Sequence, residues 1–346
     1  MTAGTTSELL YLTREEVVAC ASRLDAVAVV REALLLHAQG RTTLPAEAYL
    51  PWETEHGHFA RSLSLPGALW GESPAIGLKV INSSLGNPLH GRERAQGLTF
   101  LFDRETAHPL ALMDAGHLSA LRTAAYTVLS VRLLGVAAPR TVAVIGGGAL
   151  GLAHVRLLAR DLPTARFALY DLSPGRSAEA SRTLGADGID ITVAESAESA
   201  VRGADVVVTA TTTTEGYIPM KWIEPGALIA HVSLDDVLSD VVAEADLVVI
   251  DDWKLISEDD RRLLGRLYRT GELRGPAGEV YDPTRPLGRR VDATLSDVLL
   301  GLRPGRRDPG QIVLSNPFGM GILDVALAAE VYALAWRDGL GIRLPR

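Results

Sequence analysis

The sequence has little of several features that mark common protein classes. Its 346 residues include one cysteine, Cys20, which excludes an intramolecular disulfide and a cysteine-ligated metal cluster. Cys20 lies in a helical pattern, and we expect it to be a small core residue. The chain has no run of about 18 uncharged apolar residues, and residues 1–6 lack a basic segment followed by an apolar one. We therefore expect a cytoplasmic protein without a membrane anchor.

An excess of positive charge is also missing. The formal net charge is −8 at pH 7, so no electrostatic footprint for nucleic acid or for an anionic membrane is present, and neither partner is expected. The hydrophobic content of 47% and the charged content of 22% are ordinary for a globular protein. A chain of this length is long enough for two domains, each with its own core.

What the sequence does contain is a dinucleotide-binding pattern that begins at residue 141. The β-branched run from Thr141 to Ile145 predicts a buried strand, and a glycine-rich loop separates it from a helical pattern. Gly146 permits the tight turn, Gly148 lets the backbone approach a pyrophosphate at the helix N-terminus, and Gly151 lets helix and strand pack closely. The predicted cofactor-binding residues are Gly146, Gly148, Ala149, Leu150 and Gly151 in this region, and Thr123 on the preceding helix.

An acidic residue at the expected distance indicates which dinucleotide is bound. Asp171 lies 20 residues beyond Gly151, at the end of a second predicted strand from Arg166 to Tyr170. A carboxylate there accepts hydrogen bonds from ribose hydroxyls and repels a 2′-phosphate, so we predict NAD and not NADP. Arg176 is a candidate to bind the 2′-phosphate of NADP, but an arginine in a loop is more often a solvated surface charge.

The residues before this pattern indicate a domain of a different kind. A capping box that starts at Thr13 and an N-cap at Asp25 predict two amphipathic helices. Strand-like alternation follows, and then a long helix from about Leu118 to Leu134. The predicted strands lie near Phe59 to Leu65, Ile76 to Asn82, Leu98 to Asp103 and Pro109 to Met113, with a hairpin turn at Asp103 to Thr106.

Beyond Asp171, short β-branched segments alternate with helical patterns, which is typical of a doubly wound parallel sheet. The strands are predicted at Ile189 to Val193, Val206 to Thr211, Ala227 to Ser233 and Leu247 to Asp251, with a helix near Arg261 to Tyr268. A glycine-rich segment precedes the apolar last helix, Ile322 to Ala335, so we expect the chain to cross back and pack this helix on the first domain. The predicted fold class is α/β. A Rossmann-type doubly wound NAD-binding domain covers 136–315, and an α+β domain for substrate binding and dimerisation covers 1–135 with 316–346.

A nicotinamide enzyme also needs groups that hold its substrate, and three cations in the first domain are candidates. Lys79 lies inside an apolar run, where alternation predicts a polar residue on one face or a lysine that points into a cavity. Arg122 lies in the first turns of an alanine-rich helix. The positive end of the helix dipole repels a cation there unless an anion compensates the dipole and the arginine. Arg61 begins a strand. The functional interpretation is a carboxylate clamp formed by Arg61 and Arg122, with Lys79 near the reacting nitrogen; the alternative is that each is a surface or interface charge.

Two other groups of residues are candidates for chemistry. His56 and His58 share one face of a strand, but no third ligand of matching spacing is near them, so we interpret them as loop or surface residues and predict no metal. Asp235 and Asp236 follow a strand end that is led by His231, and ligands gather at the carboxyl ends of strands in open α/β sheets. We expect one aspartate to reach the substrate amine as a base or as an ammonium partner, and the other to cap a helix.

Several motifs in this chain are characteristic of one known family. They are Gly77 to Val80, Leu101 to Asp103 with Met113 to Ala115, Ser119 to Ala125, the glycine loop, and Gly321 to Asp324. Together they resemble the ornithine cyclodeaminase and mu-crystallin family of nicotinamide enzymes over nearly the whole chain. The resemblance implies that Lys79 and the arginines contact a substrate carboxylate, that Asp235 does acid–base work, and that subunits pair through the first domain as a homodimer.

Departures from the family pattern indicate the subclass. Cyclodeaminases carry a cysteine-proline-glycine-lysine run where this chain has Asp236 to Ser239, which argues against ornithine cyclisation. The segments Lys79 to Ser84, Arg94 to Leu98 and Asn316 to Gly321 are more similar to the branch that makes 2,3-diaminopropionate for siderophores and peptide antibiotics. The substrate of that branch is a secondary amine with several carboxylates, N-(2-amino-2-carboxyethyl)-L-glutamate.

The reaction that this resemblance implies is hydride transfer to NAD from the carbon beside the secondary nitrogen. Hydrolysis of the imine then gives 2-oxoglutarate and 2,3-diaminopropionate. Lys79 and Asp235 would manage the protons, and Arg61 and Arg122 would hold carboxylates. The alternatives are an ornithine or lysine cyclodeaminase that forms proline or pipecolate plus ammonia with NAD recycled, a ketimine or amino-acid dehydrogenase, and a non-catalytic ligand-binding protein.

Overall fold

The computed structural model describes residues 8–345, and the chain divides into two compact units. Unit 1 comprises residues 1–122 and 320–346, and unit 2 comprises residues 123–319. The first division therefore falls inside the helix α3 (Gly116–Leu134), whereas the sequence placed the domain join after residue 135. The second division follows Gly319, four residues later than the sequence placed it.

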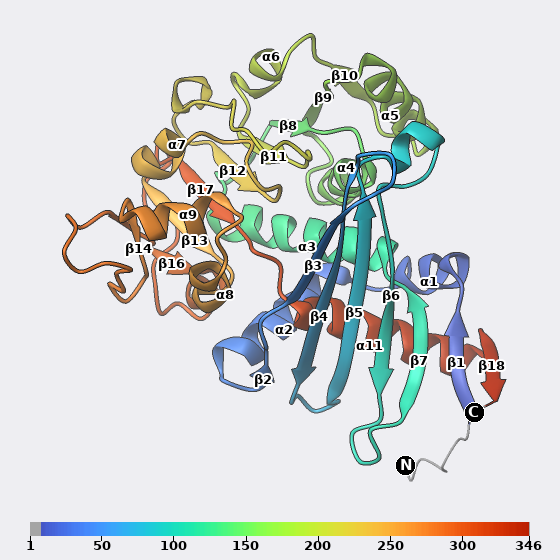
Figure 1. Ribbon diagram of the computed structural model, residues 1–346. Coiled ribbons are helices and arrows are strands. Elements are labelled where there is room, and N and C mark those ends of the chain that lie inside the picture. Colours follow the sequence, from blue (N-terminus) through green and yellow to red (C-terminus); the bar gives the residue numbers. More distant parts are fainter. Residues whose placement is uncertain (1–7, 346) are drawn as a thin grey trace. The chain divides into compact units, whose positions relative to one another are not determined.

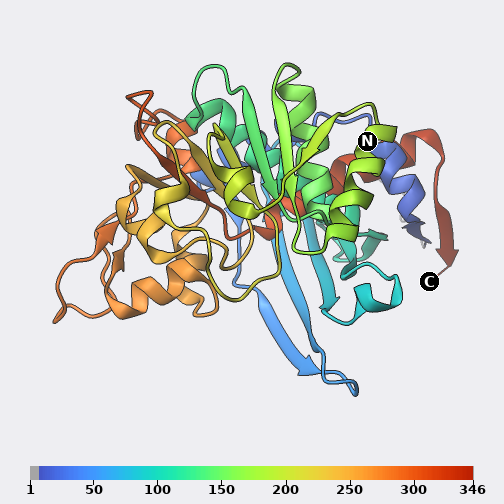
Figure 2. The ribbon, with the colours of Figure 1, turned by 90° about the horizontal axis from the view of Figure 1, so that it is seen from above.

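Unit 1 is built on a mixed eight-stranded sheet with the order β18-β1-β7-β6-β5-β4-β2, in which β3 also pairs with β4. The strands from β3 to β7 pair antiparallel, and β1 pairs parallel to β7. The hairpin of β3 and β4 extends away from the rest of this sheet (Figure 2). The elements are β1 (Glu8–Leu12), α1 (Arg14–Ala21), α2 (Ala26–Ala38), β2 (Thr42–Thr43), β3 (Ala48–Glu53), β4 (Phe59–Leu69), β5 (Ala75–Ser84), η1 (Asn87–His90), β6 (Ala95–Phe102), β7 (Pro109–Asp114), the start of α3, α11 (Gly321–Asp338) and β18 (Ile342–Pro345).

Local signals in the sequence of unit 1 are confirmed. The Thr13 side chain accepts a hydrogen bond from the Glu16 backbone and the Glu16 side chain accepts one from the Thr13 backbone, which is the predicted capping box. Asp25 caps α2. The Asp103 side chain closes the predicted hairpin turn by accepting two backbone hydrogen bonds, and Cys20 is fully buried.

The helix α11 packs on one face of this sheet, as predicted (Figure 1). It contacts β4, β5, β6 and α2. The packing is close because two glycines leave room: a Cβ at Gly67 would lie 2.9 Å from the Ile322 backbone nitrogen, and one at Gly321 would lie 2.9 Å from the Leu65 carbonyl oxygen. Asp324 is a charged residue among the buried side chains of α11.

Unit 2 has an eight-stranded sheet with the order β10-β9-β8-β11-β12-β17-β13-β16, and all of its pairings are parallel. The predicted Rossmann-type doubly wound sheet is therefore confirmed. The elements are the rest of α3, β8 (Thr141–Ile145), α4 (Ala149–Asp161), β9 (Arg166–Tyr170), α5 (Pro174–Ala186), β10 (Ile191–Val193), α6 (Ala197–Val201), β11 (Val206–Thr209), η2 (Met220–Trp222), β12 (Leu228–His231), α7 (Ser239–Glu244), β13 (Leu247–Ile250), α8 (Trp253–Glu258), α9 (Leu263–Thr270), β14 (Leu273–Arg274), β15 (Arg289–Arg290), β16 (Ala293–Thr294), α10 (Leu295–Leu299) and β17 (Val313–Asn316).

The strand order of unit 2 reverses at β8. From β8 the sheet continues through β9 and β10 on one side and through β11 and β12 on the other. Ligands of open α/β sheets bind outside the carboxyl ends of the strands at such a switch point. We therefore expect a ligand-binding site in the loops that follow β8, β9, β11 and β12. No helix within residues 8–345 is long and apolar enough to cross a bilayer.

Candidate active site

The loop after β8 has the backbone geometry that a dinucleotide needs. Gly146 has a φ of +111°, which a glycine adopts without strain. A Cβ at Gly151 would lie 1.9 Å from the Gly146 carbonyl oxygen, so only glycine lets α4 pack against the loop. A Cβ at Gly148 would meet no atom within 4 Å, and Gly148 is the N-cap of α4 with no side-chain cap. The open space at an uncapped helix N-terminus fits a pyrophosphate.

Asp171 follows β9 and is held against this loop. Its Oδ2 accepts a hydrogen bond from the Gly147 backbone at 2.8 Å, and its Oδ1 accepts one from the Ser173 backbone at 2.9 Å. This is the place where dinucleotide-binding folds put an acidic residue for the adenosine ribose. Arg176 is exposed, and its Cγ would lie 3.5 Å from a Cβ on Gly147, so it also borders the loop.

The other predicted cofactor contacts lie on two helices of unit 2. Ala149 and Leu150 form the first turn of α4. Thr123 is 8% exposed and lies on α3, one turn before Thr127, whose hydroxyl is 3.0 Å from Nε2 of His154 on α4. The placement of Ala149, Leu150 and Thr123 agrees with a role at the loop, and their contacts with a cofactor stay predictions.

In unit 1, a buried carboxylate joins two of the three predicted cations. Lys79 Nζ donates to Asp324 Oδ2 at 2.8 Å and to Ser119 Oγ at 3.1 Å. Arg122 Nε donates to Asp324 Oδ1 at 3.3 Å. Lys79 is 1% exposed and Asp324 is fully buried, whereas the Arg122 side chain is 11% exposed, so Arg122 is the most accessible member of the cluster. Asp324 is the anion that an arginine near the start of α3 requires.

The cluster has two properties that suit chemistry on an amino acid. Burial lowers the pKa of Lys79 to about 8; Asp324 opposes this shift, and the positive charge of Arg122 adds to it. A lysine with such a pKa can both accept and donate a proton near neutral pH. The two terminal nitrogens of Arg122 make no hydrogen bond within residues 8–345, so they are available to a carboxylate ligand.

Arg61, the third predicted cation, lies outside this cluster. It is on β4 and pairs with Ser83 of β5, four residues along the strand from Lys79. At roughly 3.3 Å per residue, the backbones of Ser83 and Lys79 are about 13 Å apart along β5. The structure thus brings Lys79 and Arg122 together but places Arg61 further along the same sheet.

The two aspartates after β12 have different surroundings. Asp236 is fully buried, and its carboxylate accepts hydrogen bonds from the hydroxyls of Thr211 at 2.7 Å, Tyr217 at 2.9 Å and Ser233. Three hydroxyl donors leave this carboxylate little capacity for a ligand.

Asp235, in contrast, forms an ion pair with Arg266 of α9, whose side chain is 42% exposed. Asp235 itself is 5% exposed, and its role in binding a ligand stays a prediction. The expectation that the other aspartate caps a helix is wrong: α7 begins at Ser239, and its N-cap is Leu238. Asp236 instead accepts hydrogen bonds from three hydroxyl groups, which satisfy its carboxylate inside the domain.

His231 supports the turn that carries these aspartates. Its Nε2 accepts a hydrogen bond from the Asp236 backbone at 3.2 Å, and its Nδ1 is 3.3 Å from Oδ1 of Asn316. Burial lowers the pKa of His231, which favours the neutral ring. Because one ring nitrogen accepts, the other donates to Asn316, and the histidine is a fixed link between β12 and β17.

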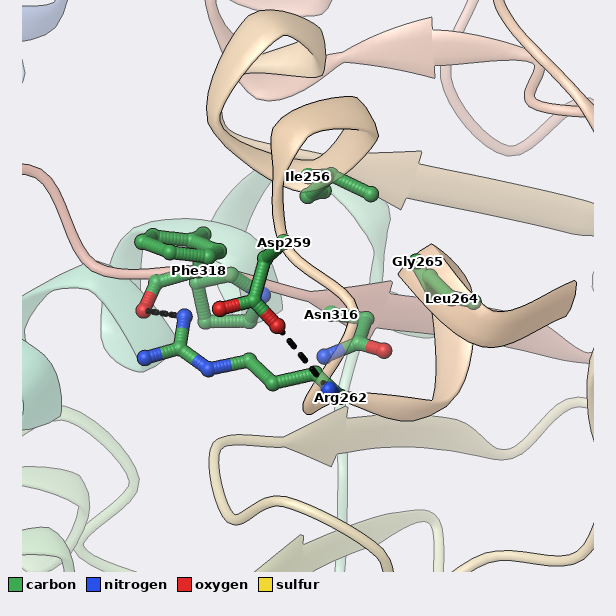
Figure 3. Close-up of a pocket in the computed structure, with 8 residues that line it drawn as sticks. Ile256, Asp259, Arg262, Leu264, Gly265, Asn316 and Phe318 are labelled. Atoms are coloured by element: carbon green, nitrogen blue, oxygen red, sulfur yellow. Dashed lines mark hydrogen bonds between the residues drawn. The ribbon is translucent and has the colours of Figure 1, made fainter. Parts of the chain in front are cut away.

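Asn316 also lines a small pocket of unit 2 (Figure 3). Arg262 Nη1 donates to the Phe318 carbonyl oxygen at 2.6 Å, and the guanidinium lies 3.6 Å from the centre of the Phe318 ring. Asp259 accepts a hydrogen bond from the Arg262 backbone at 2.9 Å. These contacts hold the segment after β17 against the start of α9. The pocket is lined by Ile256, Asp259, Arg262, Leu264, Gly265, Asn316, Pro317 and Phe318.

Neither histidine of the β3–β4 hairpin belongs to a metal-binding group. His56 is exposed and His58 is half-buried near the tip of the hairpin. In the part of the chain that the structure describes, no three His, Cys, Asp or Glu side chains are grouped so that they could hold a metal ion.

Comparisons with known proteins support these findings. The profile of the ornithine cyclodeaminase/mu-crystallin family matches residues 8–338. The chain belongs to this family. Within it, N-((2S)-2-amino-2-carboxyethyl)-L-glutamate dehydrogenase of Staphylococcus aureus is 31% identical, over 97% of this chain and 98% of that protein. The predicted family is therefore confirmed.

Two solved structures of similar proteins share the fold over the whole chain. The structure of CmnK is 44% identical and covers 98% of both chains, with a TM-score of 0.89. An archaeal alanine dehydrogenase, solved as a dimer with bound NAD, is 28% identical and covers 97% of this chain and 99% of its own, with a TM-score of 0.80.

Proposed function

We propose that this chain oxidises N-(2-amino-2-carboxyethyl)-L-glutamate with NAD and yields 2-oxoglutarate and 2,3-diaminopropionate for siderophore or peptide-antibiotic biosynthesis. The observation that carries the proposal is the end-to-end similarity to the dehydrogenase of that name from Staphylococcus aureus. The residues Asp236 to Ser239, which replace the run expected of a cyclodeaminase, also support it. At a coarser level, the chain is an NAD-dependent oxidoreductase that acts on amino-acid derivatives.

The cofactor is NAD, as the sequence predicted. We assign its pyrophosphate to the start of α4, where Gly148 leaves open space, and its ribose hydroxyls to Asp171, which is held against the glycine loop. When bound, NAD accepts a hydride from the carbon beside the substrate nitrogen.

We assign the remaining roles to four individual side chains. Arg122 binds the carboxylate next to the reacting carbon through its terminal nitrogens, and Arg61 holds a further carboxylate. Asp235 accepts the proton of the secondary ammonium, and Lys79 exchanges a proton with the water that adds to the resulting imine. The C–N bond then breaks, the oxygen of that water becomes the keto oxygen of 2-oxoglutarate, and the nitrogen leaves with 2,3-diaminopropionate.

The test is an incubation of the protein with NAD and the glutamate–diaminopropionate adduct, in which NADH and ammonia are measured together. We expect one NADH for each 2,3-diaminopropionate and no ammonia. An ornithine or lysine cyclodeaminase would instead release ammonia with proline or pipecolate and accumulate no NADH. Absence of NADH with the adduct, with ammonia formed from ornithine, would replace our proposal by that alternative.

The choice of NAD over NADP is tested at Asp171. Replacement by serine removes a carboxylate that accepts from the Gly147 backbone and repels a 2′-phosphate. We expect Asp171→Ser to weaken NAD binding about 10-fold, the loss of roughly one charge-assisted hydrogen bond, and to strengthen NADP binding. Calorimetric titration with both nucleotides measures this. Unchanged NAD affinity would show that the ribose is bound elsewhere.

We further propose that two copies of the chain pair through the sheet of unit 1. Lys79 points to the face covered by α11, so Val80 and its partner Leu98 point to the other face. There Leu98 is 38% exposed and Leu50 is 64% exposed. The archaeal alanine dehydrogenase was solved as a dimer, which supports pairing of two copies but does not identify the surface.

Light scattering after size exclusion tests this pairing. The chain has a mass of 36.9 kDa, and we expect the wild type to elute at twice that mass. Leu98→Lys places a charge in the apolar face and is expected to give monomers. Leu89→Lys, at a leucine that is 71% exposed in η1, is the matched control and should remain dimeric. A dimeric Leu98→Lys variant would exclude this face.

A further inference from the structure

A partly exposed ion pair lies at the turn that follows β12. Arg266 of α9 donates to Asp235 Oδ1 through Nη2 and to the Arg261 carbonyl oxygen through Nη1. The Arg266 side chain is 42% exposed, whereas the Asp235 side chain is 7% exposed. Within residues 8–345 this is the only hydrogen bond to the Asp235 carboxylate, so Oδ2 of this nearly buried group accepts none.

The neighbouring arginines of the chain have different partners. Arg269, also on α9, donates to three backbone carbonyl oxygens around the start of that helix. Arg261 forms an ion pair with Asp259, and the guanidinium of Arg262 packs on an aromatic ring. These three side chains fix α9 and the segments around it. Arg266 differs from them because its carboxylate partner is the aspartate to which we assign a proton transfer.

Arg266 has the donors to hold a second carboxylate. Each terminal nitrogen of a guanidinium carries two hydrogens, and Nε of Arg266 makes no hydrogen bond within residues 8–345. Because much of this side chain is in contact with water, moving it away from Asp235 costs less free energy than moving a buried cation. The pair is therefore suited to a ligand that carries a positive and a negative charge close together.

The proposed substrate carries such a pair of charges. Only two carbon atoms separate its secondary nitrogen from the carboxylate of its diaminopropionyl part. We have assigned the proton of that nitrogen to Asp235. A ligand held there has this carboxylate close to the guanidinium that contacts Asp235. The substrate ammonium then faces Asp235, the carboxylate faces Arg266, and both charges of the ion pair meet an opposite charge.

We propose that Arg266 binds the carboxylate of the diaminopropionyl part and thereby selects secondary amines whose departing half is an amino acid. This inference rests on the proposed function and deepens it, because it assigns the carboxylate that neither Arg122 nor Arg61 binds. A secondary amine without this carboxylate leaves Arg266 paired with Asp235. Arg266 then competes with the substrate nitrogen for the aspartate, so such an amine is a poor substrate.

The experiment compares two substrates that differ in one group: the glutamate–diaminopropionate adduct and N-(2-aminoethyl)-L-glutamate, which lacks the carboxylate in question. We expect the wild type to prefer the adduct about 100-fold in kcat/KM, the effect of a hydrogen-bonded charge pair, and Arg266→Gln to reduce this preference to about 3-fold or less. An effect of the lost ion pair on Asp235 is common to both substrates and cancels in their ratio. An unchanged ratio in Arg266→Gln would overturn the proposal.

Two further variants control for charge and for folding. Arg290→Gln removes an exposed arginine of β15 in the same unit and should leave the ratio unchanged. Arg266→Lys keeps a positive charge beside Asp235 and is used if Arg266→Gln does not fold. An ammonium lacks the fork that binds a carboxylate in parallel, so we expect Arg266→Lys to reduce the ratio about 10-fold. An Arg266→Lys enzyme with the ratio of the wild type would contradict our assignment.

A binding measurement distinguishes failure of this inference from failure of the proposed function. With saturating NADH, which cannot accept a hydride, calorimetry compares the binding of the same two amines. We expect the wild type to bind the adduct at least about 10-fold more tightly and Arg266→Gln to lose that preference. If this preference exists but NAD is never reduced, the site at Arg266 stands and the proposed reaction fails. If the wild type binds both amines equally, the inference is wrong.

Discussion

Lys79→Met is expected to reduce kcat about 1,000-fold, within the range for loss of an acid–base group, and also to lower the free energy of unfolding by about 3 kcal/mol. The loss of stability follows from Asp324, which is fully buried and accepts a 2.8 Å hydrogen bond from Lys79. In the variant this carboxylate keeps only the 3.3 Å contact with Arg122. Steady-state kinetics and chemical denaturation of the same preparation measure the two effects.

Lys79→Arg separates the two effects. An arginine keeps a positive charge beside Asp324 but does not release its proton, because a guanidinium stays protonated at every working pH. We therefore expect a smaller loss of stability than in Lys79→Met, with the same loss of kcat. For the wild type, kcat in the direction of oxidation should rise as the pH increases through about 8, where Lys79 loses its proton. An active Lys79→Arg enzyme, or a flat kcat profile, would rule out proton transfer by this residue.

Gly148→Ala is expected to raise the Kd for NAD about 100-fold without changing the free energy of unfolding. A Cβ at this position meets no protein atom within 4 Å, so the fold has no reason to change. The added methyl group instead occupies the space that we assign to the pyrophosphate, at the uncapped start of α4. Denaturation of the NAD-free protein and a nucleotide titration are the two measurements.

Gly151→Ala provides the contrast. Here the Cβ would lie 1.9 Å from the Gly146 carbonyl oxygen, a backbone atom that can move only if α4 shifts. We expect a loss of about 3 kcal/mol or more in stability, at the upper end for an overpacked site, together with the loss of NAD binding. A Gly148→Ala variant that binds NAD like the wild type would refute our placement of the pyrophosphate. A Gly151→Ala variant of unchanged stability would refute our account of how the helix packs.

Local signals explain what could be predicted from the sequence. The capping box at Thr13, the hairpin turn at Asp103 and the glycine loop each depend on residues that are neighbours in the chain, and all three have the predicted structure. The strand β17 could not be predicted in this way. It has only four residues, and its place between β12 and β13 is determined by pairing with strands far away in the sequence.

In the candidate site, too, contacts between residues that are far apart in the sequence could not be predicted from local signals. Alternation in the sequence indicates that Lys79 is unusual, but its carboxylate partner Asp324 lies 245 residues away, and only the packing of α11 on the sheet brings them together. A signal for Asp324 was present, since it is an acidic residue in a strongly apolar helix. The different roles of Asp235 and Asp236 had no such signal, because they depend on side chains contributed by several distant segments.

The bridging position of Asp324 also determines the charge balance of the cluster. Loss of the Lys79 proton lowers the summed charge of Lys79, Arg122 and Asp324 from +1 to zero, and Glu47 contributes a negative charge near Lys79 in both states. The attraction of this cluster for a carboxylate therefore weakens when Lys79 loses its proton. Substrate binding and proton acceptance therefore make opposite demands on pH. KM should increase over the same range in which kcat rises, so kcat/KM should pass through a maximum close to the pKa of Lys79, about 8.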